Sequence, residues 1–137
     1  MRPINAIILH MAYTRPSQDV GVDTIRDWHV SGNGWSDIGY HFVIRRNGCI
    51  EDGRPLHRPG AHVKNHNSDS IGICLSGGRK EKADAPDCNF TRAQWDALMH
   101  LVTELKADYP EAKVRGHRDY SGRACPGFDA AAWWDEI

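Results

Sequence analysis

Ile4-Asn5-Ala6-Ile7-Ile8-Leu9 is an apolar run rich in isoleucine, and His10 follows it directly. Such a run is typical of a β-strand that is covered on both faces, as the strands of parallel sheets are. We therefore expect a buried strand over residues 4–9. This strand would place His10 at its carboxyl end, where the functional side chains of α/β proteins often gather.

Four more segments are expected to form strands. Tyr40–Ile44 and Cys49–Glu51 flank Arg45-Arg46-Asn47-Gly48, and Asn-Gly between two such runs is a strong signal for an antiparallel hairpin. The segments Ser70–Leu75 and Lys113–Arg115 complete the set of predicted strands.

Three segments carry helix signals. Asp23–Val30 has apolar residues at three- and four-residue steps, which predicts an amphipathic helix. Thr91 to Gln94 has the capping-box pattern that opens a second helix, and Pro110 ends it. Asp129 is expected to cap a last helix. The residues that recur at these steps in the first helix are Val22, Ile25, Trp28 and His29, and the apolar stripe of the second helix consists of Trp95, Leu98, Met99, Val102 and Leu105. The last helix carries Trp133 and Trp134.

Two long stretches have no periodic pattern and are expected to be surface loops. Gly53–Asp69 contains prolines, glycines, asparagines and histidines, and Gly77–Asn89 is charged and contains Pro86. Loops of this length are usually functional. Because helices and strands alternate along the chain, the sequence predicts an α/β fold with a central mixed β-sheet flanked by helices.

Size and composition narrow the function classes. The chain of 137 residues fits a single domain over residues 1–137, since one core typically occupies about 100–150 residues. Its 17 basic and 18 acidic residues give a net charge of −1 and form no basic stripe, so nucleic acid is not expected as the main ligand. The few apolar residues before His10 are too short for a signal peptide or a membrane span. We therefore expect a chain made in the cytoplasm.

Four cysteines occur without a Cys-x-x-Cys pair, and they are expected to stay reduced. Cys49 and Cys74 stand in apolar runs and are interpreted as small core residues. Cys125 differs, because it follows His117 after a short loop in the stretch Ala124-Cys125-Pro126-Gly127. Only this cysteine has a context that suggests chemistry.

His10, His117 and Cys125 together form a candidate set of metal ligands. Each histidine follows a predicted strand, so both could project from one edge of the sheet. Two imidazoles and one thiolate can hold zinc and leave its fourth tetrahedral position to water, as in catalytic zinc sites. An electron-transfer copper site is an alternative, because Met11 follows His10. Zinc is favoured over copper, since the loop after Cys125 lacks the histidine and methionine that such copper sites draw from it.

The chain resembles, over nearly its whole length, the zinc-dependent N-acetylmuramoyl-L-alanine amidases of the phage-lysozyme type, which share a fold with the animal peptidoglycan recognition proteins. The segments that carry the resemblance are Ile7–His10, Pro16–Val22, Ile25–His29, Gly34–Phe42, Asn67–Leu75 and Ala124–Asp129.

The resemblance implies roles for particular residues. It implies that His10, His117 and Cys125 hold one Zn²⁺ and that Tyr40 and the position of Arg123 form the catalytic surroundings. The family usually has lysine where this chain has Arg123. Arginine keeps its charge at any accessible pH, so Arg123 is expected to stabilise charge without transferring protons. An Arg123 side chain that points into solvent is the alternative.

The resemblance also concerns the loop Gly53–Asp69, called here the histidine-rich loop. His62 and Asn67 match family positions that contact substrate, and both offer hydrogen-bonding groups to a muramyl peptide. His57 and His66 are interpreted as solvated, and His29 and His100 as helix-surface residues without a role.

The function implied is hydrolysis of the amide between N-acetylmuramic acid and L-alanine in bacterial peptidoglycan, by a phage or prophage endolysin without a separate cell-wall-binding domain. Such an enzyme would wait as a monomer in the host cytoplasm and reach the wall during lysis, with no membrane partner of its own. A catalytically silent peptidoglycan-binding module is the second hypothesis, although members of that kind commonly lack the cysteine ligand that this chain retains.

Overall fold

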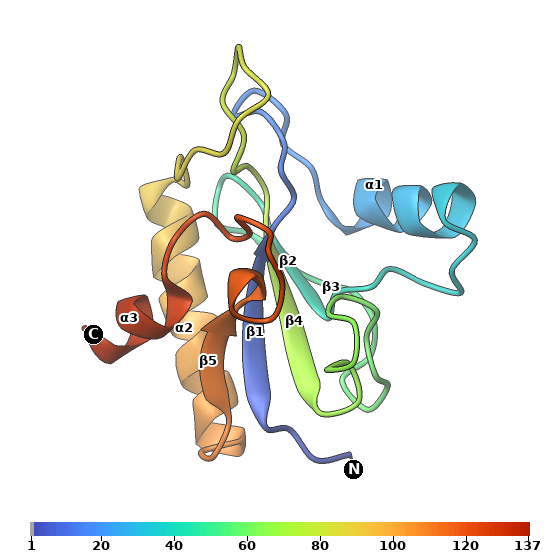
Figure 1. Ribbon diagram of the computed structural model, residues 1–137, viewed down its shortest axis with the longest axis vertical. Coiled ribbons are helices and arrows are strands. Elements are labelled where there is room, and N and C mark those ends of the chain that lie inside the picture. The colour runs from blue at the N-terminus through green and yellow to red at the C-terminus, as the bar shows by residue number, and fades with distance from the viewer. Residues whose placement is uncertain (1) are drawn as a thin grey trace.

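A five-stranded sheet forms the centre of the molecule in the computed structural model, which describes residues 2–137 (Figure 1). The order of its strands is β3-β2-β4-β1-β5. The pairs β2–β4, β4–β1 and β1–β5 are parallel, and only the hairpin pair β2–β3 is antiparallel. The predicted mixed sheet and hairpin are therefore confirmed. The strands are β1 (Ala6–Met11), β2 (Phe42–Ile44), β3 (Ile50–Asp52), β4 (Ser70–Leu75) and β5 (Lys113–Gly116).

Strand β1 lies between β4 and β5 and is almost fully buried, as its apolar sequence predicts. It begins and ends two residues later than the predicted range of 4–9, because its ladder with β4 continues through the pairs His10↔Cys74 and Met11↔Leu75. His10 therefore lies within the strand, not beyond it. Since side chains alternate along a strand, His10 points to the opposite face from Leu9.

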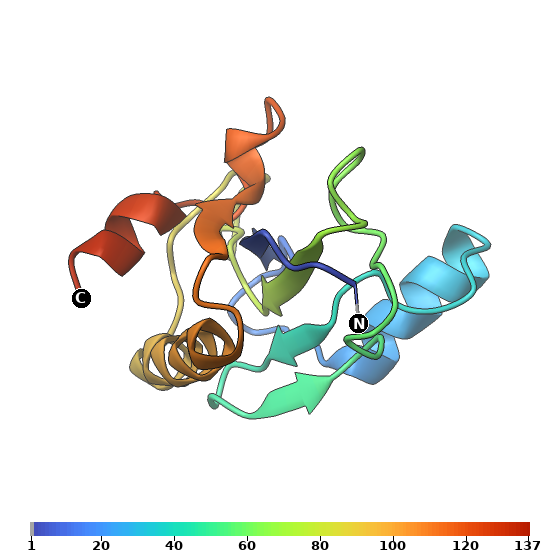
Figure 2. The same ribbon diagram turned by 90° about the horizontal axis from the view of Figure 1, so that it is seen from below.

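Helix α2 (Arg92–Asp108) covers the face of the sheet to which Leu9 points (Figure 2). Leu98, Val102 and Leu105 pack there against the strands. The predicted capping box is present, since Thr91 Oγ1 accepts from the backbone N–H of Gln94 and the Gln94 side chain accepts from the N–H of Thr91. Asp129 caps the last helix, α3 (Ala130–Asp135), as predicted.

Helix α1 (Val22–Asp27) packs against the other face near the hairpin strands. It passes into a π-helical turn, η1 (Trp28–Gly32), so the predicted helix over 23–30 exists but changes its geometry midway. Trp28, the first residue of this turn, is 42% exposed, so its predicted place on the buried face of the helix is wrong.

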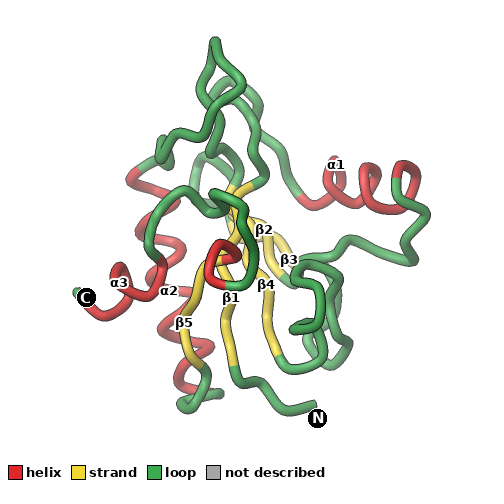
Figure 3. Tube along the Cα trace, viewed as in Figure 1, coloured by secondary structure: helices red, strands yellow, loops and turns green. Residues whose placement is uncertain are grey.

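The predicted loops over residues 53–69 and 77–89 are present and belong to the green stretches of Figure 3. The segments 12–21 and 33–41 also lie outside helices and strands, so the predicted strand from Tyr40 begins two residues later, at Phe42. Cys74 is buried as expected, but Cys49 is exposed, because it lies in the hairpin turn just before the edge strand β3. The cysteines are all free. Within residues 2–137, no helix is both long enough and apolar enough to cross a bilayer.

Candidate metal centre

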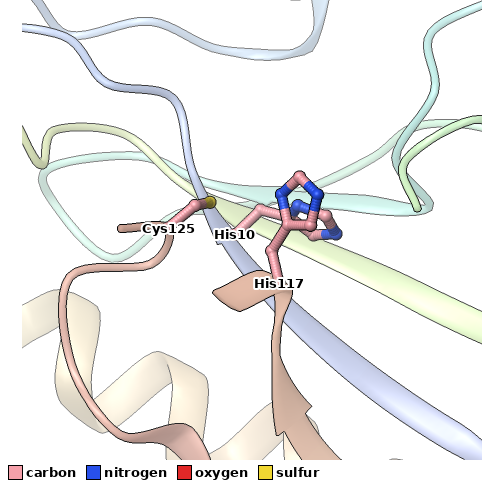
Figure 4. Close-up of side chains that lie close together, drawn as sticks. All are labelled: His10, His117 and Cys125. Carbon is pink, nitrogen blue, oxygen red and sulfur yellow. The ribbon is translucent and has the colours of Figure 1, made fainter. Parts of the chain in front are cut away.

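His10, His117 and Cys125 converge on one point of the sheet (Figure 4). Each offers one ligand atom, and these atoms all lie within 4.8 Å of one another. His10 and His117 meet because β1 and β5 are parallel neighbours with Leu9 opposite Gly116, which sets the two histidines level. His117 opens a short 3₁₀ turn, η2 (His117–Asp119), directly after β5.

Hydrogen bonds of the backbone hold Cys125 near the two histidines. The N–H of Arg118 donates to the carbonyl of Cys125 at 2.7 Å, which ties the returning loop to η2. The N–H of Met11 donates to Cys125 Sγ at 3.0 Å. A backbone donor of this kind stabilises a thiolate. The fold thus holds the sulfur beside β1 before any ion binds.

The electrostatics of the three groups suit a soft divalent cation. Burial lowers the pKa of His10 well below its usual value, and the neighbouring His62 and His117 lower it further. Burial followed by the charge of Arg123 also lowers the pKa of His117. Both imidazoles are therefore neutral and can donate a lone pair. Burial raises the pKa of the Cys125 thiol to about 11, and a coordinated divalent ion deprotonates such a thiol.

This donor set fits zinc better than copper. Two neutral imidazoles and one sulfur match a three-ligand zinc site with an open fourth position. A copper site would require Met11 as a weak axial ligand. Met11, however, follows His10 in the strand and packs toward the α2 side of the sheet, beside Gly78 and Gly127.

Tyr40 and Arg123 flank the candidate metal centre. The ring centroids of Tyr40 and His10 are 5.0 Å apart. Burial raises the pKa of Tyr40 well above its usual value, so its phenol remains a hydrogen-bond donor. Arg123 is exposed, and its positive charge lowers the pKa values of both His117 and Tyr40. Arg123 also lines both cavities that meet at this site.

The candidate metal centre lies beside the junction of two cavities, because Tyr40, His117 and Arg123 line both and Cys125 lines the first. The first cavity, of about 450 Å³, extends along apolar side chains that include Ala12 and Pro86. The second, of about 570 Å³, lies between the loop that carries residues 61–67 and the segment that carries residues 117–123. These two segments rise on the sheet face opposite α2 (Figure 2). The candidate centre therefore lies in the middle of a cleft that can hold an extended ligand.

His62 and Asn67 lie in the wall of this cleft, but their polar atoms also bind the protein. His62 Nδ1 is 2.8 Å from His10 Nε2. Asn67 Oδ1 accepts from the backbone N–H groups of His62 and Val63, both at 2.9 Å. Burial lowers the pKa of His62 to about 3, so its imidazole is neutral. The two residues therefore line the cleft and also support the site through hydrogen bonds to His10 and to the loop backbone.

Other lining residues were not singled out by the sequence. His29 was interpreted as a helix-surface residue without a role, but the structure places it in the cleft wall, where its Nδ1 accepts from the N–H of Gly39. Trp35 packs on His29, and Tyr120 packs on His66 with ring centroids 4.5 Å apart. The π-helical turn that brings His29 to the cleft has no sequence signal we recognise. His57 and His100 are exposed, as predicted.

Comparison with known proteins agrees with this architecture. Residues 1–128 match the family model described as N-acetylmuramoyl-L-alanine amidase. The chain is 47% identical over 130 residues to the endolysin of Klebsiella phage KP32, which covers 95% of this chain and 85% of that protein.

Solved structures with the same fold extend this likeness. The Ph2119 endolysin from a Thermus scotoductus bacteriophage superposes with a TM-score of 0.81 at 29% identity, over 99% of this chain and 85% of that one. A Drosophila PGRP-LB mutant in complex with tracheal cytotoxin superposes with a TM-score of 0.76 at 27% identity, over 97% of this chain and 80% of that one.

Fold, ligand cluster and cleft together define a hydrolase of the type found in cell-wall amidases, with a group of side chains that could hold one metal ion. The chain belongs to the N-acetylmuramoyl-L-alanine amidase family.

Proposed function

We propose that this chain is a zinc-dependent endolysin that cleaves the amide between the lactyl group of N-acetylmuramic acid and the L-alanine of the stem peptide. The convergence of His10, His117 and Cys125 beside a cleft carries the proposal. Zinc bound by these residues would acidify a water molecule and polarise the scissile carbonyl.

Tyr40 and Arg123 then stabilise the charge that develops on the amide oxygen. The Tyr40 phenol keeps its proton and donates a hydrogen bond, and Arg123 contributes a permanent positive charge from the open side of the cleft. Because Arg123 does not release a proton at accessible pH, the leaving nitrogen receives its proton through solvent. The role of Arg123 is therefore electrostatic.

The two cavities accommodate the two halves of the substrate, with the scissile bond at the junction lined by Tyr40, His117 and Arg123. His62 and Asn67 belong to the wall of the larger cavity and contact the muramyl peptide there. The PGRP-LB complex supports this assignment, since that protein binds the muropeptide tracheal cytotoxin in the same fold.

We also propose that residues 1–137 act as one catalytic domain and that the protein works as a monomer; a site whose candidate ligands and lining residues all belong to one chain is compatible with this. We further propose that it is held in the host cytoplasm until lysis gives it access to the wall. The similarity to phage endolysins supports this order of events.

The test is digestion of purified peptidoglycan, with analysis of the products by mass spectrometry. We expect free stem peptides that begin with L-alanine, loss of activity in a chelator, and recovery on addition of zinc. Glycan fragments with intact muramyl peptides would contradict amidase activity. Binding to peptidoglycan without any cleavage would support the silent module instead.

A further inference from the structure

A row of hydrogen bonds connects His10 to the backbone of the histidine-rich loop. Ser70 Oγ lies 2.6 Å from the carbonyl oxygen of His66 and 3.2 Å from His62 Nε2. His62 Nδ1 lies 2.8 Å from His10 Nε2. The row therefore runs from a carbonyl of the loop, through one hydroxyl and one imidazole, to a candidate metal ligand.

The carbonyl of His66, at the end of the row away from His10, determines which atom donates in each of these hydrogen bonds. A carbonyl oxygen only accepts, so Ser70 donates its hydroxyl proton to His66 and must accept from His62. His62 therefore carries its proton on Nε2, which leaves Nδ1 as the acceptor. His10 then donates from Nε2, so its Nδ1 carries the free lone pair.

We propose that His62 is a positioning residue that fixes the tautomer and the ring orientation of His10, so that His10 presents Nδ1 to the metal. This inference rests on the proposed zinc function. A metal-bound histidine generally donates its other N–H to a partner, and loss of that partner typically lowers metal affinity about 10–100-fold. The usual partner is a carboxylate or a carbonyl, whereas here it is a second imidazole.

Packing around His62 supports a fixed ring. A Cβ atom added at Gly72 would lie 2.7 Å from Cγ and Cδ2 of His62. Glycine weakens a strand interior and often marks a close approach there, and Gly72 stands in the middle of β4. The rings of His62 and His10 meet edge to face, with an interplanar angle of 86°. Because Gly72 has no side chain, the His62 ring can lie against the β4 backbone and next to the His10 ring.

Asn67 extends the support by one step. Its Oδ1 accepts from the N–H of His62 itself, which holds the backbone from which the ring projects. The two residues whose sequence positions suggested substrate contact are thus joined to His10 in one structural unit.

The experiment compares His62→Leu, which removes the acceptor, with His62→Asn, whose Oδ1 can replace Nδ1 as acceptor. His57→Ala is the control, since His57 is exposed in the same loop and does not line the cleft. Zinc affinity is measured by competition with a chromophoric chelator, and the His10 tautomer by long-range ¹H–¹⁵N NMR of the metal-free and zinc-loaded proteins.

We expect the wild-type and His57→Ala proteins to show His10 protonated on Nε2 in both states. His62→Leu should bind zinc about 10–100-fold more weakly and show mixed His10 tautomers without metal, and His62→Asn should recover most of both properties. If His62→Leu keeps wild-type zinc affinity and a single Nε2–H tautomer, the inference is wrong and the zinc site stands. A wild-type protein that binds no zinc would overturn the proposed function as well.

Discussion

Arg123 stands at the position where the resemblance described above implies lysine, and its surroundings bear on what this difference means. The guanidinium is exposed at the junction of the two cavities, and within residues 2–137 it takes part in no ion pair. It is therefore available to the substrate. A long, positively charged side chain at this position can act on the substrate through its length and charge, whether it ends in a guanidinium or an ammonium group.

Arg123→Ala should lower kcat/KM about 10²–10³-fold, the usual cost of one group that stabilises an oxyanion. Arg123→Lys should restore at least a large part of the activity, because it restores the charge. The measurement is the rate of stem-peptide release at saturating zinc. An Arg123→Lys protein as inactive as Arg123→Ala would show that the guanidinium has a geometric role of its own.

His41, next to Tyr40 in the sequence, serves the fold. It is 1% exposed, its Nδ1 accepts from the N–H of Gly72, and its Nε2 donates to the carbonyl of Arg58. Burial, together with the nearby charges of Arg2 and Arg54, lowers its pKa to about 4, although the Arg58 carbonyl acts in the opposite direction. The folded protein therefore holds His41 neutral where an unfolded chain would protonate it.

This difference predicts a dependence of stability on pH. Between pH 6.5 and about 4 the unfolded state binds a proton at His41 that the folded state does not, so the stability from this group is complete above pH 6.5 and falls as the pH falls. In His41→Asn, the loss of unfolding free energy between pH 7 and pH 5 should be smaller by about 2 kcal/mol.

Urea unfolding of metal-free protein at the two pH values measures this effect without the zinc ligands bound. His100→Asn is the control, because His100 is exposed on α2. Equal pH dependence of the wild-type and His41→Asn proteins would contradict the assignment.

At the scale of elements, the start of helix α2 joins the helix to the hairpin. Thr91 Oγ1 accepts from the N–H of Gln94 and donates to the carbonyl of Arg46 at 2.6 Å. Gln94 is fully buried, and its Nε2 donates to the carbonyls of Ile44 and Ser76. The capping box therefore also positions α2 against β2 and β4.

Thr91→Ala should lower the unfolding free energy by about 1–2 kcal/mol, since it removes the cap and a bond to the hairpin. Thr103→Ala changes an exposed threonine of the same helix and should stay within about 0.5 kcal/mol of wild type. Urea denaturation of both variants gives the comparison. Equal losses in the two proteins would mean that the cap contributes nothing beyond helix propensity.

The elements also show which features can be predicted from the sequence. The apolar runs of β1 and β4, the Asn-Gly hairpin and the capping box each have a local physical cause, and all are present, with β1 shifted by two residues from its predicted range. The metal ligands could be proposed because each histidine is close to a strand. The bond between His62 and His10 joins residues of a loop and a strand, so no local pattern encodes it. The one sequence feature that relates to this bond is Gly72, a glycine inside a buried strand, which indicates that another group lies close to the backbone there.

At the scale of the whole molecule, the candidate site joins the first strand to the last loop. The core under α2 is built from apolar side chains of β1, β4 and the helix, so the fold should persist without metal. Bound zinc then adds stability by linkage, about 2.7 kcal/mol when free zinc is 100 times its dissociation constant.

Removal of zinc should therefore lower the melting temperature and leave the circular dichroism spectrum nearly unchanged. Cys125→Ser should lose this zinc-dependent increment, and its zinc affinity should fall by more than the roughly 100-fold that loss of a supporting residue can cause. Cys49→Ser, which changes an exposed cysteine, should behave as wild type. A Cys125→Ser protein with full zinc-dependent stabilisation would refute Cys125 as a ligand.

The strand order has a consequence for protein synthesis. The ribosome makes β1 first, yet both neighbours of β1 in the sheet, β4 and β5, are translated later. His10 therefore leaves the exit tunnel long before His117 and Cys125, the other two candidate ligands. A nascent chain therefore lacks the complete set of candidate ligands until Cys125 has emerged and folded back to His10.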